Sequence, residues 1–278
     1  MRILIFGATG MLGKDLAPAF AGHEVTGLGS RDADLREEHQ ILRVVQGARA
    51  DWIILSAAYT DVDGCETNPE RAFAINRDGA IHVARAAAKS GSRLIFISSD
   101  YVFDGEKRTP YETDDPRNPI NVYGRSKAEA ECRLLEITSD CCIVRTSWLY
   151  GIGGKCFPDT MLRLAKTQPE LRVVNDQHGC PTYTVDLARA IAELTRSQTS
   201  GIVHATNRGS CSWFEFANAI LAVKSPQTSV LAVSTAEFSR PAKRPAYSVL
   251  SDRSIRECGI ELPTWQDALA SYLRQRND

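Results

Sequence analysis

Two side chains in the middle of the chain could together move a proton, because Tyr123 and Lys127 form a Y-x-x-x-K pattern. Residues four positions apart share one face of a helix, so this spacing predicts that the ammonium group lies beside the phenol. A phenol has a pKa of about 10 and exchanges protons poorly at neutral pH. A neighbouring cation favours the phenolate, so we expect Lys127 to lower the pKa of Tyr123 and make it an acid-base group.

A third polar group is expected at the same place, because Ser99 follows directly after the apolar run 94–98. The carboxyl ends of parallel strands are where ligands bind in α/β sheets. Ser99 could therefore donate a hydrogen bond to a carbonyl oxygen beside Tyr123. A Y-x-x-x-K pattern alone is common by chance, but a strand-end hydroxyl, a tyrosine and a lysine in this order are what a carbonyl reductase requires. The predicted catalytic residues are Ser99, Tyr123 and Lys127.

A glycine-rich turn near the N-terminus predicts a phosphate-binding site. The turn has the spacing G-x-x-G-x-x-G and follows the apolar run 3–6. Glycines allow close approach of the backbone to a pyrophosphate, and the helix that follows offers free N–H groups at its N-terminus. The spacing resembles that of the extended short-chain dehydrogenase/reductases. The cofactor contacts expected here are Gly7, Thr9, Gly10, Met11, Leu12 and Gly13.

The end of the second predicted strand, residues 25–28, indicates which nicotinamide cofactor binds. A carboxylate there would bind the ribose 2′-hydroxyl, whereas an arginine would accept a 2′-phosphate. Ser30 and Arg31 favour NADPH, because a guanidinium matches the geometry of a phosphate, although Asp32 could serve the ribose of NADH instead. NADPH is the predicted cofactor, with NADH as a second donor. The residues that could border the adenine are Asp34 and Leu35.

Apolar runs and amphipathic stretches alternate through the first half of the chain. Five runs predict buried parallel strands, at residues 3–6, 25–28, 52–56, 94–98 and 142–145. Helical patterns separate them, for example at 72–90. Strands that alternate with helices are typical of βαβ units, so we expect an α/β fold with a Rossmann-type, doubly wound parallel sheet.

The second half is less regular and predicts a smaller, discontinuous α/β lobe that binds the substrate. Helical patterns occur at residues 160–166, 185–195, 213–223 and 265–274, whereas strands are short and scattered. The segment 185–207 is expected to return to the large sheet. We therefore assign residues 1–146 and about 183–207 to the dinucleotide-binding domain, and about 147–182 with 208–278 to the substrate-binding lobe.

Composition excludes several classes of function. The 278 residues carry a formal net charge of -1, which gives no electrostatic case for nucleic acid or an anionic membrane. No stretch reaches the ~20 apolar residues of a membrane helix, and the N-terminus does not resemble a signal peptide. The eight cysteines lack metal-binding spacing and predict reduced thiols. We expect a soluble, cytoplasmic protein.

Longer blocks of sequence resemble the dTDP-4-dehydrorhamnose reductase family over nearly the whole chain. The blocks lie at residues 7–13, 56–63, 75–76, 98–105, 121–124, 145–151, 176–182 and 244–245. This resemblance implies NADPH-dependent reduction of the C4 ketone of dTDP-4-dehydro-L-rhamnose to dTDP-L-rhamnose. That reaction belongs to dTDP-rhamnose biosynthesis and so to the making of cell-surface polysaccharide.

The resemblance also implies roles for individual side chains. Tyr123 would donate the proton, Lys127 would hold the nicotinamide ribose, and Ser99 stands where the family usually has threonine. The residues that would line the path of the cofactor are Ala57, Ala58 and Tyr59. The residues that would meet the sugar are Ser99, Asp100, Tyr123 and Trp148. Cationic candidates for the nucleotide diphosphate are Arg240, Lys243 and Arg244.

A homodimer is also implied by the resemblance. Some members of the family carry acidic residues for a magnesium ion at a dimer contact, but these positions find no match here. We therefore predict no metal.

Three alternative functions remain open from the sequence. A reductase could act on another nucleotide-linked 4-keto-6-deoxy sugar by the same chemistry. A dehydratase or epimerase of the same fold is disfavoured, because the related dehydratases have an Asp-Glu pair where Asp100 is followed by Tyr101. Regulatory subunits similar to this family bind NADP and partner a methionine adenosyltransferase, and fold alone does not distinguish them from enzymes.

Overall fold

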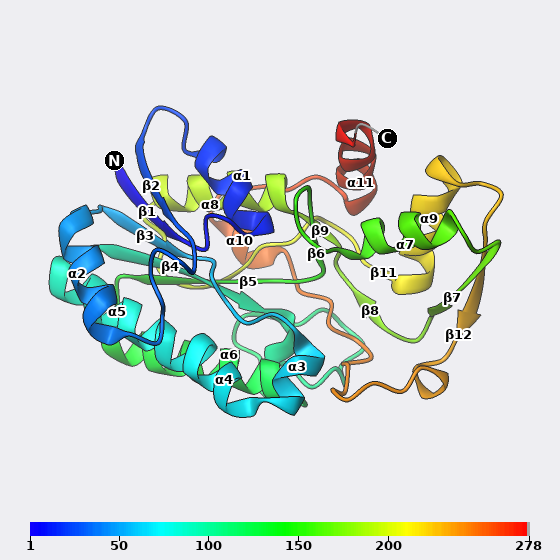
Figure 1. Cartoon of the computed structure of the whole chain (residues 1–278), viewed down its shortest axis with the longest axis horizontal. Helices are drawn as coiled ribbons and strands as arrows, with labels where there is room; N and C mark the ends of the chain where they lie inside the picture. Colours follow the sequence, from blue (N-terminus) through cyan, green and yellow to red (C-terminus); the bar gives the residue numbers. More distant parts are fainter. Residues whose placement is uncertain (277–278) are drawn as a thin grey trace.

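A six-stranded parallel sheet forms the middle layer of the protein in the computed structural model, which describes residues 1–276 (Figure 1). The strand order is β10-β5-β4-β3-β1-β2, so the direction in which strands are added reverses between β1 and β3. The strands are β1 (Arg2–Phe6), β2 (Glu24–Leu28), β3 (Trp52–Leu55), β4 (Arg93–Ser99), β5 (Cys141–Thr146) and β10 (Gly201–His204). The predicted doubly wound sheet is confirmed.

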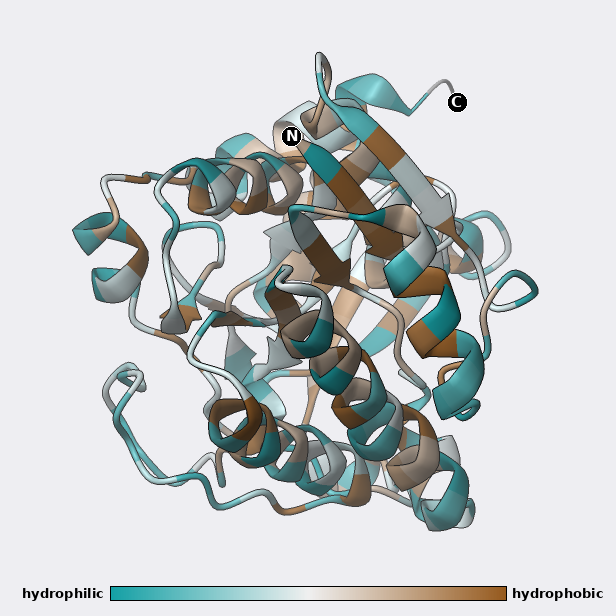
Figure 2. Ribbon diagram, turned by 90° about the vertical axis from the view of Figure 1, so that its left-hand side faces the viewer, coloured by the Kyte–Doolittle hydropathy of each residue, from teal (hydrophilic) through white to brown (hydrophobic). Residues whose placement is uncertain are grey.

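Helices cover both faces of this sheet, which explains why its strands are apolar on both sides. Ile3 and Ile5 of β1 pack with the helices on one face, whereas Leu4 and Phe6 pack with those on the other. The first face carries α1 (Met11–Ala19), α8 (Thr184–Arg196) and α10 (Arg253–Glu257). The second face carries α2 (Glu38–Ala48), α5 (Gly79–Ser90) and α6 (Val122–Ile137). Figure 2 shows the hydrophobic strands enclosed between helices with hydrophilic outer surfaces.

The helix predicted at 72–90 is interrupted. The chain forms α3 (Val62–Thr67), α4 (Pro69–Phe73) and a π-helical turn η1 (Ala74–Asp78) before α5. Asn76 lies in this turn, and its side chain accepts a hydrogen bond from the Tyr59 N–H and donates to the Tyr59 carbonyl and to Ser126. π-Turns inside helices often occur at functional sites. Here the turn ties the loop after β3 to α6.

The smaller lobe packs around aromatic side chains, among them Tyr150, Phe216 and Tyr272. Its helices are α7 (Phe157–Ala165), α9 (Trp213–Lys224) and α11 (Trp265–Gln275). Its strands pair two by two, as β7 (Glu170–Val174) with β12 (Ser229–Val233), β6 (Leu149–Tyr150) with β9 (Thr182–Tyr183), and β8 (His178–Gly179) with β11 (Cys211–Ser212). Short 3-10 turns are η2 (Asp100–Val102) and η3 (Thr235–Glu237). The residue bounds of the dinucleotide-binding domain and of the substrate-binding lobe remain a prediction.

A buried ion pair joins α6 to the sheet. Glu131 and Arg145 have fully buried side chains, and Arg145 Nη2 lies 2.7 Å from Glu131 Oε2. Ser98 on β4 and Arg117 also donate to this carboxylate, at 2.5 and 2.6 Å. Arg145 outweighs the effect of burial and, with Ser98 and Arg117, holds the pKa of Glu131 below its usual range. The carboxylate is therefore charged inside the core.

Within residues 1–276, no helix combines the length and apolar character needed to cross a bilayer.

Glu131→Gln should lower the free energy of unfolding by about 3–5 kcal/mol, because it leaves buried guanidinium groups without their anion. Urea denaturation followed by circular dichroism measures this loss. Glu129→Gln is the matched control on the same helix, because Glu129 is half exposed and pairs with Arg77 at the surface. The control should change stability by less than about 1 kcal/mol. Equal effects of the two variants would contradict the assignment of Glu131 as the structural anion.

Candidate active site

A large cleft of about 1130 Å³ lies at the carboxyl ends of the parallel strands, where the strand order reverses. Its lining comes from the loops after β1, β3, β4 and β5 and from parts of the smaller lobe that include Trp213, Arg240 and Arg244. Ligands bind at such reversal points in open parallel sheets. The volume exceeds the ~300–1,000 Å³ of a pocket for a drug-sized ligand, so the cleft can hold a dinucleotide and a second molecule.

The glycine turn has the geometry that a pyrophosphate requires. Gly7 has a φ of +90°, and a Cβ at this position would lie 2.6 Å from the Ala57 amide nitrogen. A Cβ at Gly13 would collide with the Gly7 carbonyl oxygen. Helix α1 begins just after Gly10, which provides no side-chain cap. The uncapped N–H groups of the first turn can therefore bind an anion. The predicted contacts Gly7, Thr9, Gly10, Met11, Leu12 and Gly13 all line the cleft.

The loop after β2 differs from the prediction in one important residue. Ser30, Asp34 and Leu35 line the cleft as expected, but Arg31 is exposed and does not. Arg36, which the sequence analysis overlooked, does line the cleft and pairs with Asp34 at 2.5 Å. The motif predicts that the arginine for the 2′-phosphate directly follows the strand. In this loop the arginine that lines the cleft is Arg36, five residues after Arg31.

The carboxylate of Asp32 is already used within the loop. Its Oδ2 accepts a hydrogen bond from the Gly29 N–H at 2.8 Å. This contact closes the turn after β2 and leaves Asp32 poorly placed to serve a ribose hydroxyl. The loop therefore favours NADPH, whose 2′-phosphate a cationic side chain can bind.

The loop after β3 contributes several neighbouring residues to the cleft lining. Ala57, Ala58 and Tyr59 line the cleft, as predicted. The backbone of Tyr59 is fixed by both hydrogen bonds to Asn76, and the Arg71 guanidinium lies 4.8 Å from the centre of its ring. A rigid loop here can hold a flat ring without reorganisation.

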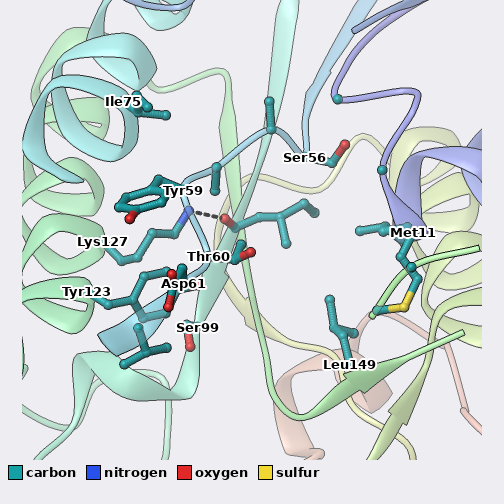
Figure 3. Close-up of a pocket in the computed structure, with 18 of the residues that line it drawn as sticks. Met11, Ser56, Tyr59, Thr60, Asp61, Ile75, Ser99, Tyr123, Lys127 and Leu149 are labelled. Carbon is teal, nitrogen blue, oxygen red and sulfur yellow. Dashed lines mark hydrogen bonds between the residues drawn. The ribbon is translucent and has the colours of Figure 1, made fainter. Parts of the chain in front are cut away.

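The three predicted catalytic residues come together from β4 and α6. Figure 3 shows Tyr123 and Lys127 extending from the helix into the cleft, with Tyr123 beside Ser99, on the side opposite Met11 and Leu149. The N-terminus of α6 is capped by Asn121, whose side chain accepts a hydrogen bond from the Gly124 N–H at 2.7 Å. This cap fixes the first turn, in which Tyr123 lies.

Tyr123 is partly exposed to the cleft, but its phenol is largely desolvated. Burial raises the pKa of its phenol, the Asp100 carboxylate adds to this effect, and the Ser99 hydroxyl opposes it. The expectation that Lys127 lowers the pKa of Tyr123 is therefore not met in this structure. Tyr123 is a neutral phenol that keeps its proton until a strong base develops beside it.

The reason lies in the direction of the Lys127 side chain. Its Nζ donates to the Ile97 carbonyl oxygen at 2.6 Å, the dashed line in Figure 3, and lies 4.0 Å from the centre of the Phe96 ring. Burial lowers the pKa of Lys127 to about 7, although Glu131 opposes the shift. The four-residue spacing puts both residues on one helix face, but a backbone carbonyl directs the ammonium group.

Asp100, which was predicted to meet the sugar, lines the cleft next to Ser99. It is 2% exposed, and Oδ1 accepts a hydrogen bond from the Ser99 hydroxyl at 2.8 Å. Burial raises the pKa of Asp100 to about 6, although hydroxyl groups of Ser248 and Ser99 oppose this shift. Thr146 Oγ1 lines the same region and is buried without a hydrogen-bond partner among residues 1–276. Such an orphaned group fits a site that receives a polar ligand.

Trp148 lines the cleft in a strained conformation. Its φ is +47°, which is rare for a bulky residue and often marks a functional site. Its ring stacks on Trp213, with 3.5 Å between ring centres and 4° between planes. The sequence predicted Trp148 but missed Trp213 and Phe157, which pack beside it and also line the cleft. Their apolar pattern is that of ordinary core residues, so no local signal marks them.

Two of the three cationic residues predicted for the nucleotide diphosphate reach the cleft. Arg240 and Arg244 line the cleft, whereas Lys243 does not. In the part of the chain that the structure describes, no group of three or more metal-ligating side chains is gathered.

The protein belongs to the Rossmann-type reductase class. Its parallel sheet and glycine turn border one cleft, and a hydroxyl, a phenol and an ammonium group line the same cleft. The family model described as RmlD substrate binding domain matches residues 1–277, and the chain belongs to this family.

Similar proteins cover the chain from end to end. The Bacillus subtilis spore coat polysaccharide biosynthesis protein SpsK is 43% identical and covers 99% of this chain and 98% of its own. The dTDP-4-dehydrorhamnose reductase of Burkholderia thailandensis is 39% identical with the same two coverages. The Bacillus anthracis dTDP-4-dehydrorhamnose reductase in complex with NADP has 40% identity and a TM-score of 0.96, covering 99% of both chains. The predicted family is confirmed.

Asp100→Asn should stabilise the protein at pH 8 by about 1–3 kcal/mol, because Asn has no charge to bury. The folded pKa of Asp100, about 6, exceeds its ordinary value of 3.8. The folded state thus binds more protons than the unfolded state between these values, so the wild-type free energy of unfolding falls as pH rises through this window. The gain should shrink to about half at pH 5.

Urea denaturation at pH 5 and at pH 8 measures the stability gain of Asp100→Asn at each pH. The control Asp140→Asn removes a carboxylate that is 68% exposed and should show no such pH dependence. A gain for Asp100→Asn that is independent of pH would refute this explanation.

Proposed function

We propose that the protein reduces the C4 ketone of dTDP-4-dehydro-L-rhamnose with NADPH and forms dTDP-L-rhamnose. The observation that carries the proposal is the meeting of Ser99, Tyr123 and Lys127 in the cleft that also contains the uncapped N-terminus of α1. Relatives and a solved structure named as dTDP-4-dehydrorhamnose reductases support it, at 39% and 40% identity over nearly the whole chain.

NADPH, when bound, supplies the hydride that adds to the carbonyl carbon. The glycine turn would hold its pyrophosphate, and Ala57, Ala58 and Tyr59 would lie along it. Lys127 would hold the nicotinamide ribose. The collision that a Cβ at Gly7 or Gly13 would cause indicates that close backbone packing is built into this turn.

Tyr123 acts as the proton donor in the proposed reaction. Its proton moves to the carbonyl oxygen as negative charge develops there, which forms the new O–H bond of the alcohol. An alkoxide is a far stronger base than a phenolate, so a phenol with a raised pKa can still protonate it. The Ser99 hydroxyl, which donates to Asp100 in this structure, would turn to donate to the same oxygen and stabilise the developing charge.

The competing functions have less support. Elimination chemistry needs a second carboxylate, and Tyr101 stands in that place. A purely regulatory role gives no reason to gather Ser99, Tyr123 and Lys127 around the cleft. Another nucleotide-linked 4-keto-6-deoxy sugar stays the alternative substrate, because the same chemistry would reduce it.

We further propose that the protein works in the cytoplasm, because its eight cysteines are free thiols. We also propose that the protein forms a homodimer and that its chain divides into the dinucleotide-binding domain and the substrate-binding lobe predicted from the sequence.

Tyr123→Phe should lower kcat by about 10²–10⁴-fold, because it removes the proton donor and leaves the ring in place. NADPH oxidation, followed by absorbance with enzymatically prepared dTDP-4-dehydro-L-rhamnose, measures this. Tyr247→Phe is the control, since Tyr247 lies outside the cleft lining. Unchanged turnover in Tyr123→Phe would exclude Tyr123 as the donor. A wild type that binds NADPH without oxidising it would exclude this sugar.

Arg36→Ala should weaken NADPH binding about tenfold and leave NADH binding unchanged, because only NADPH carries the 2′-phosphate that a guanidinium binds. Arg31→Ala should change neither, since Arg31 is exposed and is not part of the cleft lining. Dissociation constants from calorimetry with both cofactors test this without turnover. Loss of NADPH affinity in Arg31→Ala alone would restore the role that the motif predicts for that residue.

A further inference from the structure

Asp63 binds two arginines that follow it by about 180 positions in the chain. Arg240 Nη1 lies 3.3 Å from Asp63 Oδ2, and Arg244 Nη1 lies 3.1 Å from Asp63 Oδ1. The Ala242 N–H between the two arginines donates to Oδ1 at 3.2 Å. Burial acts to raise the pKa of Asp63, but the Ala242 N–H and the two arginines outweigh it and hold the pKa below its usual range. The carboxylate is therefore ionised.

These three side chains all line the cleft, and they come from two segments that lie far apart in the chain. Asp63 lies in α3, in the loop region after β3, whereas Arg240 and Arg244 lie in the segment between η3 and α10. One carboxylate and two guanidinium groups leave a net positive charge at this place. A cationic site inside a cleft attracts and orients an anion.

The backbone that carries the arginines is anchored on both sides of Arg244. The Asn121 side chain donates to the Lys243 carbonyl oxygen at 2.9 Å. Gly105, with a φ of +84°, packs so closely on Pro245 that a Cβ there would lie 2.5 Å from the Pro245 Cβ. The backbone is therefore fixed, and the guanidinium groups are the parts that can change partners.

Each arginine uses Nη1 for Asp63. A guanidinium has five N–H donors arranged as a fork, so it can bind a second oxyanion while it keeps the first. Without Asp63, two neighbouring like charges would repel each other and spread. The Asp63 carboxylate thus holds both guanidinium groups in place before a ligand binds. This lowers the conformational entropy that the arginine side chains lose on binding.

We propose that Asp63 is a positioning residue, which orients Arg240 and Arg244 to bind the diphosphate of the nucleotide sugar. This inference rests on the proposed function for the identity of the ligand, and the role of Asp63 in placing the two arginines is what it adds. The diphosphate carries two negative charges or more and matches two guanidinium forks. The reacting sugar would then lie further inside, towards Ser99 and Tyr123.

Calorimetric binding of dTDP and of UDP tests the inference without the keto sugar. Asp63→Asn, Arg240→Met and Arg244→Met should each weaken both nucleotides about tenfold, with NADPH affinity changed less than twofold. Asp63→Glu should recover part of the loss, because it restores the anion. Arg172→Met is the control, since Arg172 forms an exposed pair with Glu237 outside the cleft lining. With the keto sugar, Asp63→Asn should raise KM about tenfold and leave kcat within twofold.

Several results would overturn the inference. Unchanged or tighter dTDP binding by Asp63→Asn would show that the carboxylate competes with the ligand or is irrelevant to it. Unaltered binding by both arginine variants, or a wild type that binds neither dTDP nor UDP, would exclude a diphosphate site. A variant that loses NADPH binding as well would point to general damage, and Arg240→Met then decides, because Arg240 is 54% exposed and is not needed for packing. Nucleotide binding without reduction of the keto sugar would refute the proposed function alone.

Discussion

The buried carboxylate of Glu131 fixes α6 against the sheet, and the arrangement of the cleft depends on this contact. It receives hydrogen bonds from Ser98 on β4 and from Arg145 on β5, so a single anion joins three elements. Lys127 lies about one helical turn before Glu131, and Tyr123 lies about two turns before it. A shift of α6 by one residue would break these hydrogen bonds and carry Tyr123 away from Ser99. We infer that the pair serves position more than stability, because desolvation offsets much of the attraction within a buried ion pair.

The strands were predictable because a parallel sheet covered on both faces needs continuous apolar runs. The predicted runs 3–6 and 94–98 fall within β1 and β4. The π-turn inside the predicted helix 72–90 was not predictable, since its partner is the backbone of Tyr59, 17 residues earlier in the chain. Periodicity reports which face of a helix is buried, but it does not report a side chain that bonds to a distant loop.

The same distinction divides the residues of the cleft. Ser99, Tyr123 and the glycine turn carry local signals, because each needs a fixed place at a strand end or helix start. Trp213 and Asp63 carry none: their roles depend on Trp148 and Arg244, which only the fold brings near. Arg36 was missed for a related reason, since the length of the loop after β2 decides which of its arginines reaches the cleft.

One physical cause underlies the unusual acid-base properties of the cleft. Burial keeps Tyr123 protonated, lowers the pKa of Lys127 and raises that of Asp100, so each shift favours the neutral form. Shifts of this kind are typical of a low local dielectric, in which a hydrogen bond to a newly formed anion is worth more than in water. An oxygen that gains negative charge beside Ser99 and Tyr123 would be stabilised strongly, while a neutral ketone would gain little. The desolvation that costs stability at Asp100 thus favours the charged transition state of a carbonyl reduction over its ground state.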